Sequence, residues 1–281
     1  MADALHPAPT WQPAAWQGEK SLVTVAQGWK AVVSLERGRL MHFGPSEPEL
    51  NLLLAPPTRD NPDILGGHRV WLGPQANWSE IWPPPQAWEL SGPETCTTRG
   101  GELRLLMPDS GAGWPRLTRT YRWAGAQLVC GVELTGGTRP AQIIHIFQMP
   151  APTVVSAEAR AVAGFPLGYV RLPSKVAAFA ARFDQPLQVT RRGNALTLRH
   201  SSAIEKLGFR PQTLSGRNGS FSLAVTPDQP GGAAIGEPDE GFLSQVYLGG
   251  SEAFIELEQL SPLFAAGAPA AFTVVLEGQA Q

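Results

Sequence analysis

The sequence is poor in cysteine, in charge of either sign and in long apolar runs. Only Cys96 and Cys130 occur among 281 residues, outside any Cys-x-x-Cys or Cys/His pattern, so two buried thiols and no metal site are expected. The 22 basic and 24 acidic residues give a formal net charge of −2 without a basic run, which argues against a nucleic-acid partner. Nothing in the sequence calls for a cofactor.

No stretch approaches the roughly 20 apolar residues that cross a bilayer, which argues against a membrane partner. The first 20 residues also lack the apolar core of a secretory signal. We therefore expect a soluble, cytoplasmic protein, whose oligomeric state the sequence leaves open.

Glycine and proline are abundant and evenly spread. The 30 glycines and 27 prolines separate short apolar runs, as in a chain of many strands joined by turns. Strands are expected at 21–26, 31–36, 103–107, 117–123, 127–134, 142–149, 188–190, 195–200, 220–226, 242–247, 253–260 and 271–276. Turn residues at 192–194, 216–219 and 249–250 predict hairpins. The fold class expected is all-β, a large antiparallel β-sandwich of two packed sheets with few short helices.

Two Ala-bearing segments, 155–163 and 174–182, are the candidate helices. No internal repeat of fixed period is visible, which disfavours a propeller. We expect one β-sandwich domain over residues 21–281, preceded by an N-terminal extension over residues 1–20.

Four of the nine tryptophans gather in a proline-rich segment: Trp71, Trp78, Trp82 and Trp88. Their flat rings suit the C–H face of a sugar, with Trp71 and Trp82 as binding candidates, but they would equally plug the end of a sandwich. The preceding Gly66-Gly67 indicates backbone that needs positive φ or a close approach.

His68 and Arg69, which follow the two glycines, and Lys206 later in the chain are further candidates for binding a substrate. A structural role for His68 competes with that reading. For Arg69, a buried ion pair with a carboxylate competes with contact to substrate oxygens.

The acid–base candidates lie on two later strands. Alternation places His145 on one face with Ile143 and Phe147, where it is either a general acid or a satisfied core histidine. Alternation also puts Glu256 and Glu258 on one strand face. In a concave site these two carboxylates would raise each other's pKa, or one would pair with Arg69 or Lys206.

Three stretches carry a family resemblance: 66–75 with the later Trp82-Pro83-Pro84-Pro85, then 206–211, and 256–263. They resemble a bacterial family of unassigned function in the galactose mutarotase-like superfamily, distantly related to aldose 1-epimerases, over most of the chain from about Leu22. The resemblance implies a large β-sandwich with a sugar site on a concave sheet face. The epimerase strand Asn-His-x-Tyr-Phe-Asn-Leu is echoed by 144–149 without its leading Asn or its Tyr-Phe pair.

Three functions follow. The first is an epimerase-like isomerase that uses Glu258 or Glu256 as base and His145 or His68 as acid, which requires both groups to face one cleft. The second is a non-catalytic carbohydrate-binding module, and the third is a structural domain. A sugar or glycan is the ligand expected of the first two.

Overall fold

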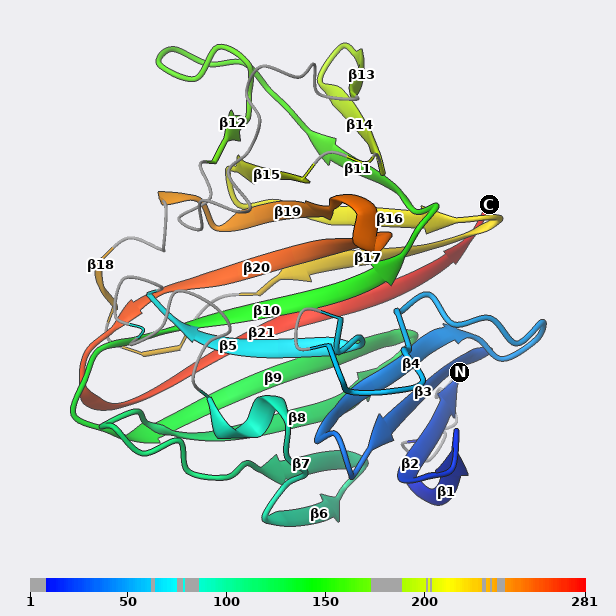
Figure 1. Ribbon diagram of the computed structural model, residues 1–281, viewed down its shortest axis with the longest axis vertical. Coiled ribbons are helices and arrows are strands. Elements are labelled where there is room, and N and C mark those ends of the chain that lie inside the picture. Colours follow the sequence, from blue (N-terminus) through cyan, green and yellow to red (C-terminus); the bar gives the residue numbers. More distant parts are fainter. Residues whose placement is uncertain are drawn as a thin grey trace, which may run out of the picture.

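The computed structural model describes residues 9–61, 64–74, 78, 86–172, 189–200, 202, 204–228, 231–232, 234–236 and 241–281. Within these ranges the fold is all-β, and every strand pairing is antiparallel (Figure 1). Two single helical turns lie wholly within the described ranges, η2 (Ala87–Glu89) and η5 (Gly250–Glu252). In the described ranges no helix has the length and apolar character needed to span a membrane.

The strands form three sheets. A four-stranded sheet runs in chain order through β1 (Gln12–Trp16), β2 (Glu19–Ala26), β3 (Trp29–Ser34) and β4 (Arg39–Pro45). A seven-stranded sheet has the order β12 (Val170–Arg171), β15 (Ile204–Phe209), β19 (Ser244–Gly249), β20 (Phe254–Phe264), β10 (Ala141–Pro150) and β5 (His68–Gly73), with β18 (Ala234–Gly236) also paired to β20.

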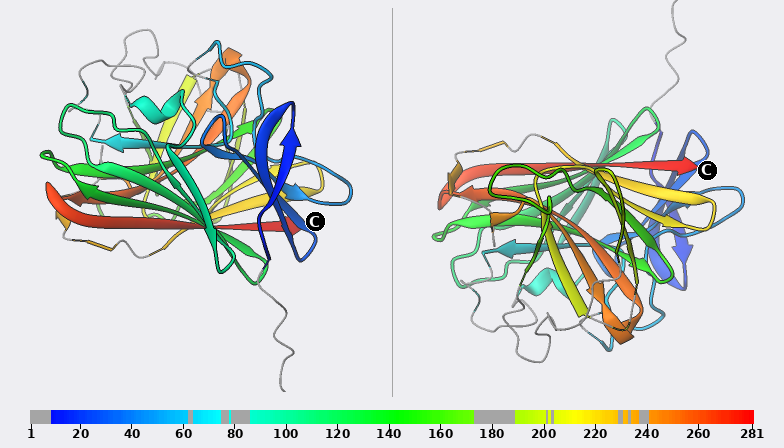
Figure 2. Two further views of the ribbon diagram at one scale, coloured as in Figure 1. Left: turned by 90° about the horizontal axis from the view of Figure 1, so that it is seen from below. Right: turned by 90° about the horizontal axis from the view of Figure 1, so that it is seen from above.

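The third sheet has ten strands. Its order is β13 (Val189–Arg192), β14 (Ala195–Arg199), β11 (Val154–Glu158), β16 (Leu214–Asn218), β17 (Phe221–Pro227), β21 (Gly267–Ala280), β9 (Gln127–Gly136), β8 (Arg116–Ala124), β7 (Glu102–Leu106) and β6 (Thr95–Arg99). The two larger sheets lie as layers, with β5 in one and β21 in the other (Figure 2).

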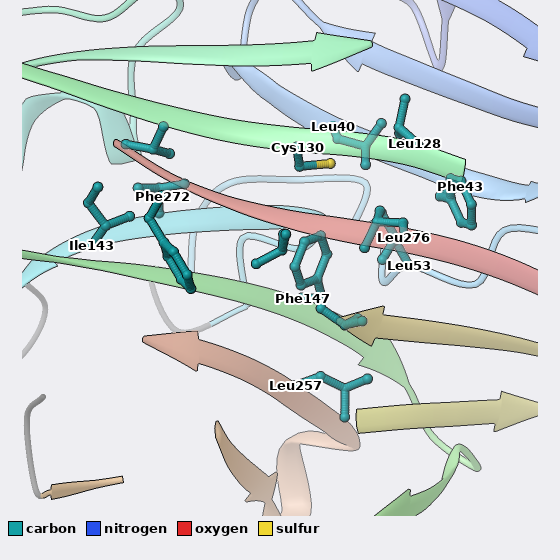
Figure 3. Close-up of a cluster of buried hydrophobic side chains, with 14 of the residues drawn as sticks. Leu40, Phe43, Leu53, Leu128, Cys130, Ile143, Phe147, Leu257, Phe272 and Leu276 are labelled. Atoms are coloured by element: carbon teal, nitrogen blue, oxygen red, sulfur yellow. The ribbon is translucent and has the colours of Figure 1, made fainter. Parts of the chain in front are cut away.

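The hydrophobic core fills the space between the layers. Figure 3 shows side chains from both sheets and from the four-stranded sheet meeting there, among them Phe147 and Leu257 from one layer and Phe272 and Leu276 from the other. All four are buried. At one end of the layers the ring of Trp29 lies where a side chain on Gly278 would stand, so β21 approaches β3 closely because position 278 is glycine.

The predicted strands are all present, and the turn predictions hold at two hairpins. Gly193 and Gly219 take positive φ between β13 and β14 and between β16 and β17, the conformation that glycine adopts without strain. The third turn, at 249–250, leads into η5 before β20 begins. β1 starts at Gln12 and pairs with β2, so sheet structure begins before residue 21.

Three expectations need correction. The candidate helix at 155–163 is wrong, because β11 pairs with β14 and β16 and its residues alternate between buried and exposed, which is strand periodicity. The second candidate helix, 174–182, lies outside the described residues. Of the two thiols only Cys130 is buried, because Cys96 lies on the exposed strand β6. The sandwich also carries a third sheet that was not expected.

Candidate functional site

The seven-stranded sheet has two faces, which strand register separates. The core face meets the ten-stranded sheet, as the contact of His145 with Phe272 shows. The opposite face, here the site face, carries the residues whose side chains alternate away from the core. Its members are Arg69, Trp71, Ile144, Ile146, Gln148, Lys206, Gln245, Tyr247, Glu256, Glu258 and Leu260.

Two carboxyl groups stand side by side at the centre of the site face. Glu256 and Glu258 are only 4% and 3% exposed, and they are two residues apart on β20, about 6.7 Å along a strand. Burial, and then the neighbouring Glu258, raise the pKa of Glu256 to about 8. Arg69, a hydrogen bond from Gln148 and Lys206 oppose this shift without cancelling it. Glu256 is therefore mostly protonated at neutral pH.

Gln148 holds Glu256 in place from β10. Its amide nitrogen donates to Glu256 Oε1 at 2.8 Å, while its amide oxygen accepts from the backbone N–H of Gly66 at 2.6 Å. Gly66 and Gly67 both have positive φ, and a Cβ atom on either would lie within 2.3 Å of a backbone carbonyl oxygen. The close backbone approach that the two glycines allow places the N–H of Gly66 where it fixes the orientation of the Gln148 amide. The positive φ of both glycines agrees with the prediction from the sequence.

Glu258 pairs with Lys206 of β15, one of the two partners expected for the carboxylates. Lys206 Nζ lies 3.4 Å from Glu258 Oε2, and the lysine side chain is 16% exposed. Tyr247 on β19 is also partly exposed beside them. The site face is therefore most open toward β15 and β19, where Lys206 and Tyr247 lie.

Arg69 and Trp71 on β5 are tied to a residue that sequence reasoning did not single out, Glu89 of η2. Arg69 donates to Glu89 Oε2 through Nε at 2.8 Å and Nη2 at 2.6 Å, and Trp71 Nε1 donates to the same oxygen at 2.9 Å. The Arg69 guanidinium also lies 4.8 Å from the Trp71 ring centroid. The structure thus realises the ion-pair alternative for Arg69.

The charge state of Glu89 follows from its neighbours. Burial would raise its pKa, but the guanidiniums of Arg69, Arg39 and Arg119 outweigh burial and hold the pKa down to about 2. Glu89 is therefore ionised and fixes Arg69 and Trp71 at the edge of the site face. The only sequence signal for it was the need of a buried arginine for a carboxylate.

His68 and His145 lie on the core face, so the expectation that His145 and Glu258 face one cleft is not met. His68 Nε2 and His145 Nδ1 are 2.8 Å apart, and His145 Nε2 is 3.2 Å from the carbonyl oxygen of Phe272. A carbonyl only accepts, so His145 carries its proton on Nε2, His68 Nε2–H donates to His145, and His68 Nδ1 accepts from the Tyr121 hydroxyl at 3.4 Å.

This chain of hydrogen bonds is made of neutral groups. Burial lowers the pKa of His145 to about 3 and that of His68 well below its ordinary value. Both rings are fully buried, and His68 stacks on Phe147 at 4.4 Å between centroids. The pair therefore acts as a satisfied polar element of the core, the structural alternative that the sequence left open for each histidine.

The tryptophans of the proline-rich segment differ in their surroundings. Trp88 is completely buried and donates to the carbonyl of Val70, so its ring fills the interior of the sandwich. Trp71 is 3% exposed and meets the half-buried Trp78 edge to face. Trp82 lies outside the described residues. In the described ranges no group of three or more His, Cys, Asp or Glu side chains is placed to hold a metal ion.

Comparison with known proteins shows the fold. No family model and no curated protein matches the sequence. A solved Escherichia coli K12 protein provisionally named an aldose 1-epimerase is 12% identical with a TM-score of 0.63, over 93% of this chain and 99% of that one. A Salmonella typhimurium protein provisionally named a mutarotase is 13% identical with a TM-score of 0.57, over 99% and 95%.

A galactose mutarotase related enzyme from Lactobacillus acidophilus is 9% identical with a TM-score of 0.56, over 92% of this chain and 97% of that one. At these identities the likeness establishes a galactose mutarotase-like fold along nearly the whole chain. It leaves chemistry to the residues of the site face.

Proposed function

We propose that the protein binds a sugar against the site face and interconverts its anomers, with Glu256 as acid and Glu258 as base. The observation that carries the proposal is the pair of adjacent buried carboxyls, one of them with a pKa raised to about 8 and the other beside a lysine. Burial and the neighbouring Glu258 raise the pKa of Glu256, so Glu256 can give a proton, and Lys206 Nζ lies 3.4 Å from Glu258 Oε2. Pairs of titratable groups held in different states are the usual basis of acid–base catalysis.

The chemistry needs one proton given and one taken. Glu258 removes the proton of the anomeric hydroxyl while Glu256 protonates the ring oxygen, so the ring C–O bond breaks and an open-chain aldehyde forms. After rotation about the C1–C2 bond, Glu256 takes the proton back from the former ring oxygen, the ring closes on the other carbonyl face, and Glu258 returns its proton to the anomeric oxygen. Glu256 and Glu258 are two residues apart on one strand and project from the same face, so their side chains can flank a single anomeric centre.

His145 takes no part in this mechanism. Its ring lies on the core face with both nitrogens engaged. The acid that the resemblance to aldose 1-epimerases assigns to a histidine is therefore supplied by a carboxyl.

The test is proton NMR exchange between α and β anomers across a panel of aldoses. Wild type should accelerate exchange for at least one sugar, and Glu258→Gln and Glu256→Gln should each lower the acceleration by 10²-fold or more. Glu158→Gln, an exposed glutamate at the end of β11, is the matched control and should keep the wild-type rate. Equal rates in wild type and Glu258→Gln would contradict the proposal.

Sugar binding without catalysis is the second candidate, because the site face holds no histidine among its described members. It predicts saturable binding of a sugar with no faster anomer exchange. Titration calorimetry with the same panel measures binding separately from catalysis. Lys206→Met should weaken sugar binding under either function, whereas only catalysis depends on the protonation of Glu256.

A further inference from the structure

A buried group of charged residues lies at the edge of the site face and serves no step of the proposed reaction. Arg39 of β4, Arg69 of β5 and Arg119 of β8 converge on Glu89 of η2, and all four are at most 6% exposed. In this arginine cluster three guanidiniums lie around one carboxylate, that of Glu89, among the residues that the structure describes. A buried charge without a counter-charge is strongly unfavourable.

Both oxygens of the Glu89 carboxylate already face donors of the cluster. Glu89 Oε2 accepts from Arg69 and Trp71, whereas Oε1 lies 3.4 Å from Arg39 Nη2 and 4.0 Å from Arg119 Nη2. Oε1 accepts no hydrogen bond of ordinary length and angle from the described residues. Arg39 and Arg119 are therefore the two cations that Glu89 compensates least.

Several donors of these two arginines are inaccessible and have no hydrogen-bond partner among the described residues. They are Arg39 Nη1 and Arg119 Nε and Nη2. The remaining donors reach backbone carbonyls: Arg39 those of Arg37 and Glu89, and Arg119 that of His68 at 2.9 Å. The hydroxyl of Tyr121 lies beside Arg119, but burial raises its pKa, so it carries no charge that would balance the guanidinium. Buried polar groups are rarely left in this state.

The excess charge cannot be removed by losing a proton at neutral pH. Burial lowers the pKa of Arg39 to about 9, with Arg119 and Arg69 adding to the effect and Glu89 opposing it. Even that value keeps the guanidinium charged at pH 7. Water could accept from the orphan donors, but it would leave the charge uncompensated, whereas an anion does both.

We propose that a small monoatomic anion of the halide class binds between Arg39 and Arg119. A single-atom anion can accept from donors of both guanidiniums at once, and it supplies the negative charge that water lacks. The site does not depend on the sugar chemistry proposed for Glu256 and Glu258. Its effect is on the stability of the fold where β4, β5, β8 and η2 meet.

The first test is thermal unfolding in sodium chloride against sodium gluconate at constant ionic strength. Each ten-fold rise in chloride above its Kd should raise the Tm of wild type by about 3–5 °C. Arg122→Met, an exposed arginine on the same strand as Arg119, should keep this dependence, and Arg119→Met should lose it. A wild-type Tm indifferent to chloride, or an Arg119→Met variant that still responds fully, would overturn the proposal.

The second test needs no variant and so holds even if Arg119→Met fails to fold. Crystals of the wild-type protein grown in sodium bromide should show an anomalous peak within about 3.5 Å of guanidinium nitrogens of both Arg39 and Arg119. Bromide found only at surface positions, with water in the cluster, would refute the site.

Discussion

Replacing Glu256 by glutamine should remove a pH-dependent cost to folding. In the folded protein burial, followed by the charge of Glu258, raises the pKa of Glu256 to about 8, whereas a glutamate in the unfolded chain titrates near 4.3. Across that window the folded state holds a proton that the unfolded state releases. The contribution of Glu256 to stability is therefore complete below about pH 4.3 and is lost as pH rises through about 8.

The magnitude follows from the proton difference. One proton more in the folded state changes the free energy of unfolding by about 1.4 kcal/mol per pH unit. Between about pH 6.5 and 7.5 the wild type should lose roughly 1 kcal/mol relative to Glu256→Gln. The variant keeps the size of the side chain and a donor in place of the carboxylic acid proton. The groups that face Glu256 are the same in wild type and variant: Arg69, Lys206, Glu258, Gln148 and Tyr247.

Buried histidines change stability with pH in the opposite direction to Glu256. The effect of Glu256 is therefore measured as the difference between wild type and Glu256→Gln. The lowered pKa values of these histidines, about 4 for His42 and about 3 for His145, give stability that is present above about pH 6.5 and is lost as pH falls below it. These terms cancel in the difference between wild type and variant. Urea unfolding at half-unit steps from pH 6 to 8.5 measures that difference, with Glu158→Gln as the control that should run parallel to wild type. Parallel curves for wild type and Glu256→Gln would refute the reasoning.

Three further outcomes follow from the geometry. Gly66→Ala should lower the free energy of unfolding by about 2–4 kcal/mol, because φ is positive there and the added Cβ would lie 2.3 Å from a carbonyl oxygen. Gly100→Ala, which has open space around the added Cβ, should lower it by about 1 kcal/mol, and urea unfolding compares the two variants. Glu89→Gln should cost about 3–5 kcal/mol in the same assay, since it leaves three buried guanidiniums without their carboxylate, and a loss under 1 kcal/mol would show the cluster is compensated otherwise. His145→Gln should lower Tm while anomer exchange per folded molecule stays within two-fold of wild type, and a far larger fall in NMR exchange rate would place the ring in the chemistry.

The strands could be predicted because their signals are local. Period-two alternation and glycine turns are readable within ten residues, as at Gly193 and Gly219. Alternation also placed Glu256 and Glu258 together on one face of β20. The segment 155–163 was misread because its alanine content favours a helix, whereas pairing on both sides made 154–158 a strand.

The faces of β10 could not be assigned from sequence. Ile143, His145 and Phe147 were correctly grouped, but Ile144 and Ile146 make the opposite face equally apolar, and only the packing of sheets decides which one meets the core. Glu89 was missed for a related reason. It lies 20 residues after Arg69 in the sequence, and only the folded chain brings its carboxylate to the Arg69 guanidinium.

The account rests on a carboxyl that gives its proton at neutral pH. The most direct measurement is the pH dependence of catalysed anomer exchange, followed by NMR for the aldose that wild type accelerates most. The rate should fall as pH rises through about 8, as Glu256 loses its proton, and this alkaline limb should be absent from the residual activity of Glu256→Gln. A rate that stays constant up to pH 9.5, or a limb that survives in the variant, would contradict Glu256 as the acid.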